Sequence, residues 1–343
     1  MRAVQVVEYG APVRLTEVAE PRLEGPSDVL VRIAGAGICR TDLHIAAGEL
    51  AAAFSPVLPY TLGHENAGWV HEVGSAVSTV KPGDPVLVHP AVTCGLCLAC
   101  RSGQDMHCPT WRFPGVDGWH GGYAELMRTS VRSLVPLPPG TDPATLAPHA
   151  DAGLTAIHAV KRLAPYTFPG ATVVVIGFGG LGHLAVQLLR KYTTADVLVV
   201  DNDPARVSWA REYGPDAAYD SGADGGVSAV LDQTGGRGAD VVLDLVGEHG
   251  VPEQALRMLR KGGVYSIVGY GGGVRLEHLD MINRELTVLG NQIGSYRDLV
   301  DLVELDRQGK VALETTRFPL EDVVDVLAEV AAGRVPGRAV LVP

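Results

Sequence analysis

The feature that most constrains the fold is a glycine-rich turn between an apolar run and a helical pattern. The turn reads GFGGLG, with Gly177, Gly179 and Gly182 in a GxGxxG spacing, and it directly follows the run TVVVI. Apolar residues then recur at helical intervals, at Leu181, Leu184, Ala185, Leu188, Leu189 and Tyr192. These residues predict a strand, a tight turn and a helix whose apolar stripe covers a sheet face.

The same alternation continues along the chain. Four more apolar runs of the buried kind, separated by helical stretches, are DVLVVD, ADVVLDLVG, VYSIVGYG and LTVLGN. Because each crossover returns the chain to the same end of the sheet, these strands must pair in parallel. These five runs predict an α/β fold over residues 149–288, a Rossmann domain, whose usual parallel sheet is six-stranded.

The regions on either side of residues 149–288 have a different sequence pattern. Residues 1–148 contain short strand-like runs separated by turn residues, which predicts a mostly β, barrel-like domain. Prolines crowd in VPLPPGTDPATLAPH, where we place its end. Residues 289–343 predict two helices and a final strand, and we expect this segment to return to the first domain.

The context of the glycine turn predicts a dinucleotide cofactor. Glycines permit the tight turn and the close approach of a pyrophosphate to the helix N-terminus, so the predicted contacts are Gly177, Gly179, Gly180, Leu181 and Gly182. Asp201 follows Gly177 by 24 residues, at the end of the next strand, where an acid takes the ribose hydroxyls. A carboxylate there repels a 2′-phosphate, and the adjacent Asn202 adds no positive charge. The cofactor predicted is NAD rather than NADP.

A second motif predicts a bound metal. Four of the five cysteines, Cys94, Cys97, Cys100 and Cys108, lie within fifteen residues in the spacing CxxCxxCx7C. Four thiolates on a turning loop suit a tetrahedral zinc with no open position, which is a structural site. Clustered free thiols or two disulfides are weaker alternatives, because no secretion signal precedes them. An iron–sulfur site, suggested by Pro109 after the last cysteine, normally has a three-residue final gap.

Size and charge exclude several classes of protein. The 343 residues allow about two domains. The net charge of -11 and the lack of a Lys/Arg block argue against nucleic acid and anionic membrane surfaces. No apolar run approaches the roughly 20 residues that span a bilayer. We expect a cytoplasmic protein.

Three further residues form a candidate reactive centre. Cys39 stands in CRTDLH, His64 in GHENAG and Asp151 in HADAGLT. Each alone is more simply a small core residue or a satisfied polar group. Together they offer one thiolate, one imidazole and one carboxylate, the three-ligand set of a catalytic zinc whose fourth position takes water or substrate.

The order of these motifs along the chain resembles that of a known enzyme family. CRTD, GHE, the CxxCxxCx7C lobe, GFGGLG and the C-terminal GRAV occur in an order, over essentially the whole chain, that resembles the zinc-containing medium-chain alcohol dehydrogenases. The segment DAGLT is similar to bacterial members with an aspartate as third zinc ligand. The resemblance implies a GroES-like barrel for the first domain, two zinc ions per chain, and a homotetramer or failing that a dimer.

The resemblance also implies roles for individual residues. Zinc held by Cys39, His64 and Asp151 would polarise an alcohol oxygen. Thr41 would carry the alcohol proton, by way of the cofactor ribose, to His44. Asp42 would hold the His64 ring, and Glu65 would either approach the metal during ligand exchange or be structural. The implied cofactor contacts are Arg40 at the pyrophosphate, Thr155 at the nicotinamide, and Val246, Val268, Gly269 and Arg338.

The predicted activity is NAD-dependent interconversion of a primary or secondary alcohol with its aldehyde or ketone. Candidate pocket walls are apolar, Phe54, Trp111, Trp119 and Ile293, which favours a hydrophobic substrate. A polyol or sugar-alcohol dehydrogenase is the alternative within the superfamily, and a non-catalytic NAD(H)-binding redox sensor is the alternative from another class. The remaining histidines, among them His107 and His183, are expected to be structural.

Overall fold

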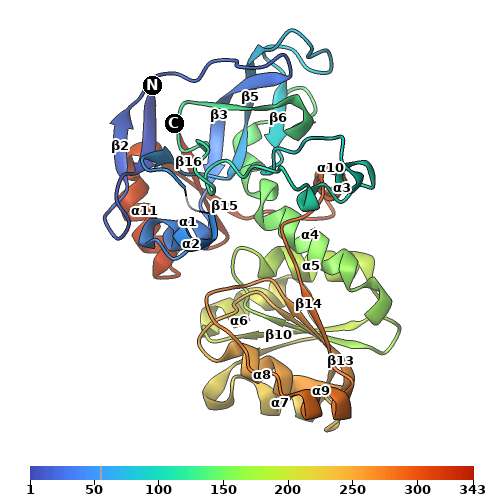
Figure 1. The fold of residues 1–343 in the computed structure, drawn as a ribbon. Coiled ribbons are helices and arrows are strands. Elements are labelled where there is room, and N and C mark those ends of the chain that lie inside the picture. Colours follow the sequence, from blue (N-terminus) through green and yellow to red (C-terminus); the bar gives the residue numbers. More distant parts are fainter. Residues whose placement is uncertain (55) are drawn as a thin grey trace. The chain divides into compact units, whose positions relative to one another are not determined.

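The computed structural model describes residues 1–54 and 56–343, which pack as two units (Figure 1). Unit 1 comprises Met1–Leu154, Ser295–Glu304 and Leu313–Pro343. Unit 2 comprises Thr155–Gly294 and Leu305–Ala312. The functional division at residues 148 and 288 stays a prediction. By packing, Leu305–Ala312 belongs with unit 2, although the whole of 289–343 was expected to return to the first domain.

Unit 2 is built on one parallel sheet of six strands, in the order β11-β10-β9-β12-β13-β14. Its strands are β9 (Thr172–Ile176), β10 (Asp196–Asp201), β11 (Ala217–Asp220), β12 (Ala239–Asp244), β13 (Leu259–Ile267) and β14 (Thr287–Gly290). All five residues of β9 are buried, as expected for the run TVVVI near the centre of a sheet. The predicted parallel six-stranded sheet is confirmed, although the short β11, with the sequence AAYD, was not recognised in advance.

Helices cover both faces of this sheet. They are α5 (Gly182–Tyr192), α6 (Pro204–Glu212), α7 (Val227–Gln233), α8 (Val251–Met258) and α9 (His278–Arg284). Figure 1 shows α5 on one face and α7, α8 and α9 on the other. The middle of the predicted α5 stripe, from Leu184 to Leu189, is buried. Tyr192 was wrongly placed in that stripe, because it lies in the last turn of the helix and is 40% exposed.

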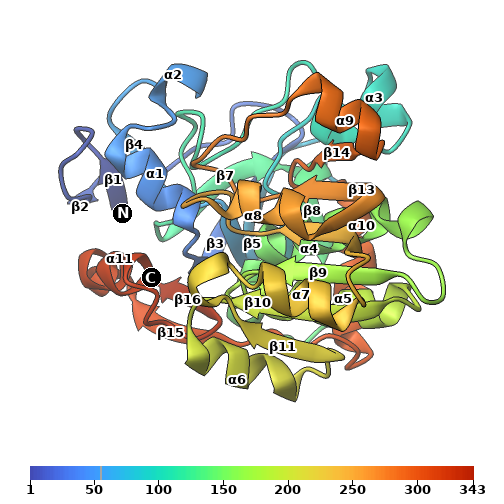
Figure 2. The same ribbon diagram turned by 90° about the horizontal axis from the view of Figure 1, so that it is seen from below.

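Unit 1 is mostly β, as predicted. Its strands are β1 (Arg2–Val6), β2 (Arg14–Glu17), β3 (Asp28–Gly37), β4 (Tyr60–Thr61), β5 (Glu65–Val73), β6 (Pro85–Val88), β7 (Leu126–Ser130), β8 (Leu134–Pro136), β15 (Thr315–Pro319) and β16 (Arg338–Val342). One sheet has the order β2-β1-β4 and the other β15-β16-β3-β5-β6-β8, with β7 also on β3. Figure 2 shows β16 beside β3, so the last strand of the chain joins the N-terminal sheet.

Helices of unit 1 connect and flank these sheets. They are α1 (Arg40–Ala47), α2 (Ala51–Phe54), α3 (Leu98–Arg101) and α11 (Val323–Ala331), while α4 (Ala152–Arg162) and α10 (Tyr296–Arg307) begin in unit 1 and end in unit 2. The C-terminal region holds the predicted two helices and final strand, and also β15, which pairs in parallel with β16 and was not expected.

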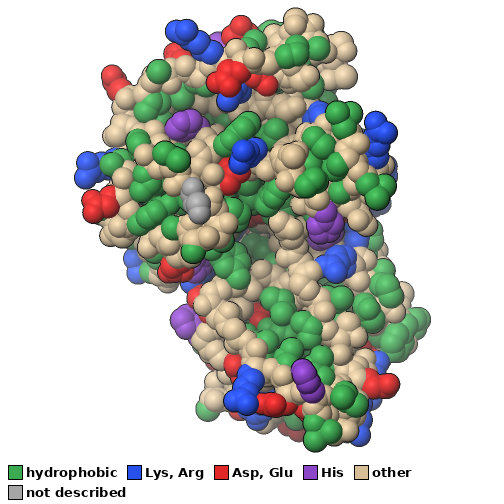
Figure 3. Space-filling view, viewed as in Figure 1, with side chains coloured by type: hydrophobic (Ala, Val, Ile, Leu, Met, Phe, Trp, Pro, Cys, Tyr) green, Lys and Arg blue, Asp and Glu red, His purple; other side chains and the backbone are tan. Residues whose placement is uncertain are grey.

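The sequence has no Lys/Arg block, and the residues that the structure describes show no basic patch on the face in Figure 3. On the face shown in Figure 3, basic and acidic side chains are interspersed. Within residues 1–54 and 56–343, no helix has both the length and the apolar character needed to cross a membrane.

The sheet of unit 1 depends on backbones that lie unusually close. Gly68 in β5 faces Ile33 across the β3–β5 pair, and a Cβ atom built on it would lie 2.1 Å from the main-chain oxygen of Arg32. Since the obstacle is backbone, a side chain here requires the two strands to shift.

We therefore expect Gly68→Ala to lower the free energy of unfolding by about 2 kcal/mol. Denaturant unfolding of the variant measures the change. Gly25→Ala is the matched control in the same unit, because its added Cβ meets the Asp28 side chain at an ordinary 3.4 Å. Equal stabilities of the two variants would contradict the packing of β5 on β3 described here.

Candidate functional site

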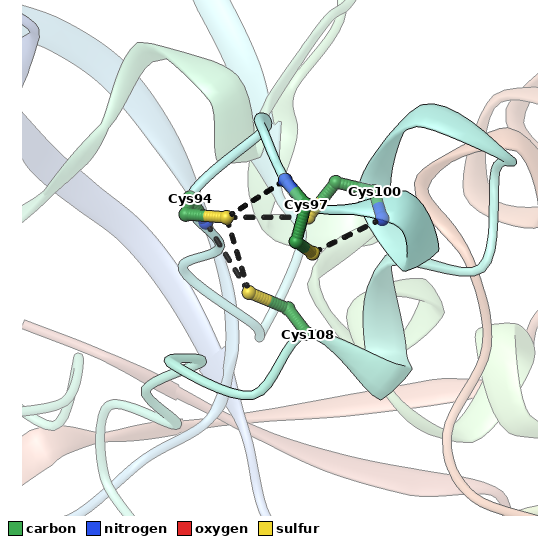
Figure 4. A group of neighbouring side chains, drawn as sticks. All are labelled: Cys94, Cys97, Cys100 and Cys108. Atoms are coloured by element: carbon green, nitrogen blue, oxygen red, sulfur yellow. Dashed lines mark hydrogen bonds between the residues drawn. The ribbon is translucent and has the colours of Figure 1, made fainter.

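The four clustered cysteines lie in a lobe of unit 1 and point toward a common centre (Figure 4). The Sγ atom of Cys94 lies 3.6 Å from that of Cys108 and 4.0 Å from that of Cys100. Two sulfur ligands at 2.3 Å from a tetrahedral zinc lie about 3.8 Å apart. The spacing of the thiols therefore fits a zinc ion, and all five cysteines of the chain are free of disulfides.

The local backbone favours the ionised thiol of Cys94, whereas burial raises the pKa of Cys100 to about 11. Main-chain N–H groups of Leu96 and Cys97 each donate to Cys94 Sγ at 3.4 Å, and these bonds lower the pKa of Cys94 to about 6. Cys97 caps α3 by accepting the N–H of Cys100. Because a zinc ligand must be a thiolate, the N–H groups around Cys94 favour metal binding at that ligand.

The second group of candidate ligands is Cys39, His64 and Asp151, which come from three separate stretches of unit 1. Cys39 is the residue before α1, His64 precedes β5, and Asp151 precedes α4. All three are buried, and their ligand atoms lie within 4.8 Å of one another. His64 Nε2 and Asp151 Oδ2 are 3.4 Å apart, whereas nitrogen and oxygen ligands of a tetrahedral zinc lie about 3.3 Å apart. The residues fit a zinc ion with three protein ligands.

The surroundings of this group are strongly anionic. Burial alone would lower the pKa of His64, but Asp42, Asp151 and Cys39 outweigh it and hold that pKa well above its ordinary value. The cluster thus favours a cation between its members, and a zinc ion carries the charge that would otherwise come from a proton on the ring.

Glu65 lies next to the centre and is fully buried. Burial raises the pKa of Glu65 to about 7, although Arg338 opposes the rise. Its Oε1 pairs with Arg338 Nη2 and accepts the N–H of Ala152 at 3.1 Å. Arg338 was predicted to contact the cofactor; its guanidinium is buried against Glu65, so its visible role is to neutralise that carboxyl.

Asp42 is fully buried and connects two of the ligands. Its Oδ1 lies 3.3 Å from Nδ1 of His64, which is the arrangement expected for a carboxylate that orients a metal-binding histidine. Its Oδ2 accepts the main-chain N–H of Cys39 at 2.9 Å, within the capping box of α1. One carboxylate thus positions the backbone of one ligand and the ring of another.

The predicted proton-carrying residues lie on α1. Thr41 Oγ1 is 3.4 Å from Cys39 Sγ, and His44 follows one turn later on the same helix. Nδ1 of His44 lies 2.6 Å from Oε2 of Glu49, a contact that the sequence analysis missed. The left-handed Gly48 ends α1 and turns Glu49 back onto the helix, so a helix-ending glycine followed by an acid was the available signal. Arg40 is exposed at the start of the helix.

In unit 2, the glycine turn has the geometry of a phosphate-binding turn. Gly177 has φ +94°, and a Cβ on Gly182 would lie 2.1 Å from the main-chain oxygen of Gly177. Gly180 and Leu181 complete the turn before α5. The carboxylate of Asp201 ends β10 and accepts the N–H of Phe178 at 2.6 Å and that of Asp203 at 2.9 Å.

Three of the predicted cofactor neighbours meet beside this turn. Val246 packs on Gly177, where an added Cβ would come within 2.8 Å of its side chain. Both Val268 and Gly269 donate their N–H groups to the main-chain oxygen of Asp244, at 2.9 and 3.0 Å. The carboxylate of Asp244 in turn accepts the N–H of Val246. This buried aspartate at the end of β12, which the sequence analysis did not single out, holds the loops at the carboxyl ends of β12 and β13 together.

The remaining predicted residues differ in their exposure to solvent. Asn202 is exposed after β10, and Thr155 is buried on α4. His183 is buried and stacks on Trp209, as expected for a structural histidine, while His107 is exposed in the cysteine lobe.

The candidate pocket walls divide into two kinds. Trp119 is 38% exposed and lies near the guanidinium groups of Arg112 and Arg128, and its place in a pocket wall stays a prediction. Trp111 contacts Phe113, whose ring meets the His64 ring edge-on with centroids 5.5 Å apart. Phe113 was missed because nothing in its local pattern marks it. Phe54 is half-buried on α2, and Ile293 is buried.

Comparisons with known proteins agree with this geometry. The family model described as alcohol dehydrogenase GroES-like domain matches residues 25–139, and that described as zinc-binding dehydrogenase matches residues 180–306. An NAD-dependent alcohol dehydrogenase of Sulfurisphaera tokodaii is 31% identical over all of both chains. A D-arabinose 1-dehydrogenase (NADP(+)) of Saccharolobus solfataricus is 34% identical over 100% of this chain and 97% of its own. The crystal structure of the alcohol dehydrogenase of Aeropyrum pernix is 45% identical, with a TM-score of 0.97 over 100% of both chains.

The fold and the two ligand groups thus define an oxidoreductase of the zinc-binding dehydrogenase class. The chain belongs to the zinc-containing medium-chain alcohol dehydrogenase family. The predicted family, fold class and enzyme class are confirmed.

The two ligand groups predict a metal content. We expect about two zinc ions per chain in the purified protein, measured by elemental analysis, and no visible absorbance. Cys97→Ala and Asp151→Ala should each leave about one ion, because each removes one ligand from a different centre. A brown protein that contains iron would instead support the iron–sulfur alternative.

Proposed function

We propose that the chain is a zinc-dependent and NAD-dependent alcohol dehydrogenase that interconverts a primary or secondary alcohol with its aldehyde or ketone. The observation that carries the proposal is the convergence of Cys39, His64 and Asp151. In the part of the chain that the structure describes, this group has three such ligands where the cysteine lobe has four. A tetrahedral ion held by three ligands keeps one position for a substrate oxygen.

When bound there, zinc supplies a Lewis acid that lowers the pKa of an alcohol. The chain supplies the rest of the proton chemistry. Thr41 Oγ1, beside the Cys39 thiol, would take up the alcohol proton while its own proton moves on by way of the cofactor ribose, and His44 on the same helix would pass a proton to solvent. Asp42 keeps the His64 ring in place, and Arg338 balances the charge of Glu65.

The cofactor prediction, zinc and NAD, is confirmed at the level of the family, which binds zinc and includes NAD-dependent relatives. In this chain the glycine turn would hold the pyrophosphate and Asp201 the adenosine ribose. The two N–H bonds to its carboxylate hold it at the end of β10. A negative charge fixed there disfavours the 2′-phosphate of NADP.

We expect Asp201→Ala to lower the ratio of kcat/KM for NAD to that for NADP by about tenfold, equivalent to about 1.4 kcal/mol. Steady-state kinetics with both cofactors measure the ratio. Asp196→Ala removes an acid from the other end of the same strand and should leave the ratio unchanged. An unaltered preference for NAD in Asp201→Ala would contradict the assignment.

For the substrate we propose a hydrophobic alcohol or ketone. Phe113, in contact with the His64 ring, and its neighbour Trp111 give the metal centre an aromatic side. A polyol or sugar substrate is the second candidate, because the relative from Saccharolobus solfataricus is named a D-arabinose 1-dehydrogenase. A redox sensor without catalysis is disfavoured, since a pure binding protein needs no three-ligand metal centre.

The test is turnover of a substrate panel with NAD, followed by absorbance of NADH. We expect 1-phenylethanol and long-chain alcohols to exceed polyols in kcat/KM. Phe113→Ala should reduce kcat/KM for 1-phenylethanol about tenfold or more, a loss of the roughly 1.5–3 kcal/mol that a buried aromatic contact contributes, and should reduce it less for ethanol. Turnover of polyols alone would support the second candidate, and NAD binding without any turnover would support the sensor.

The assembly and location remain part of the proposal. We propose a homotetramer, or failing that a dimer, in which sheets pair edge to edge. The strand β14, in the run LTVLGN, lies at an edge of the sheet and is available for such pairing, whereas β13 is flanked by β12 and β14. A cytoplasmic location fits ligand thiols that must stay reduced.

A further inference from the structure

Tyr123 is a fully buried tyrosine whose hydroxyl reaches the framework of the three-ligand centre. It precedes β7, and its hydroxyl oxygen lies 2.7 Å from Asp42 Oδ2 and 3.1 Å from the main-chain oxygen of Gly37. Burial raises the pKa of Tyr123 well above its ordinary value, so the hydroxyl keeps its proton. Of its two acceptors, the ionised carboxylate is nearer and forms the stronger, charge-assisted bond.

The carboxylate that receives this bond also orients the metal ligands. Its Oδ2 accepts the N–H of Cys39 as well as the Tyr123 hydroxyl, while Oδ1 faces Nδ1 of His64 at 3.3 Å. Two donors on one oxygen fix the direction of the whole carboxylate. A carboxylate this close to Nδ1 favours the tautomer with a proton there, which would leave the lone pair of Nε2 for a metal.

The ring of Tyr123 is placed by the segment that carries His64. Gly63 has φ +98°, and a Cβ on it would lie 2.3 Å from Cδ1 of Tyr123. The main-chain N–H of Tyr123 donates to the oxygen of Leu62 at 2.9 Å. The ring thus packs directly on the backbone before the histidine, and it holds the hydroxyl at Asp42.

We propose that Tyr123 is a positioning residue for the centre formed by Cys39, His64 and Asp151, acting through Asp42. The inference deepens the proposed function and rests on it. Without the hydroxyl, Oδ2 of Asp42 keeps one donor, the carboxylate turns more freely, and the His64 ring is held less firmly. A metal at this centre then dissociates faster.

The test compares zinc release from wild-type protein and Tyr123→Phe, both full-length and loaded with zinc, in excess dipicolinate. The four-cysteine lobe of the same chain is an internal reference, because the Tyr123 hydroxyl bonds to Asp42 and Gly37 instead. We expect release from the three-ligand centre to become about tenfold faster, as is typical when a partner behind a metal ligand is removed. Release from the lobe should not change.

Tyr60→Phe is the matched control. Tyr60 is also fully buried in unit 1, but its hydroxyl donates to the main-chain oxygen of Val116 at 3.3 Å. Both release phases of this variant should match wild type. If Tyr123→Phe also matches wild type, or if it accelerates both phases, the inference is wrong. A wild-type protein that binds zinc only in the lobe would contradict the proposed function instead.

A second measurement covers the case in which Tyr123→Phe does not fold. Incorporation of 3-fluorotyrosine at position 123 keeps the ring and hydroxyl and makes the hydroxyl a stronger donor. Slower zinc release from the three-ligand centre would support the inference. An equal or faster release would overturn it.

Discussion

The burial of negative charge beside the N-terminal sheet is the constraint on which the rest of unit 1 depends. Asp42 and Glu65 are fully buried, and the ligand Asp151 lies close to them. Isolated carboxylates in such a place would cost several kcal/mol each, so the structure must supply positive charge or strong donors. Arg338 pairs with Glu65, and hydrogen-bond donors stabilise Asp42. A zinc ion bound by Cys39, His64 and Asp151 would supply positive charge beside the third carboxylate.

Close backbone approach is how the chain delivers these groups to one place. Gly37 faces Glu65 across the β3–β5 pair, and a Cβ on Gly37 would lie 2.0 Å from Oε2 of that carboxyl. A Cβ on Gly122 would likewise lie 1.9 Å from Oδ1 of Asn66. The absence of side chains at these positions lets the strands around GHEN pack closely beside the metal centre. A residue larger than glycine at position 37 or 122 would therefore disturb the metal centre, although neither glycine binds the metal.

The sequence predicted those parts of the molecule whose functional residues lie close together in the chain at a characteristic spacing. Cysteine spacing located the lobe, and the strand, glycine turn and helix located unit 2, because both patterns are local. Local patterns could not reveal Tyr123, whose bond to Asp42 joins residues 81 positions apart, or Phe113 beside His64. The strand β11 was missed because AAYD has no run of β-branched residues, and Tyr192 was misplaced because helical periodicity does not show where the covered face ends.

The metal ligands and the predicted dinucleotide-binding residues lie in different units. Every ligand of both candidate metal centres, and every group that orients them, lies in unit 1. The glycine turn, Asp201 and the loops joined by Asp244 all lie in unit 2. Each unit thus completes its own binding framework from internal contacts, so the geometry of the metal centre does not require a bound dinucleotide.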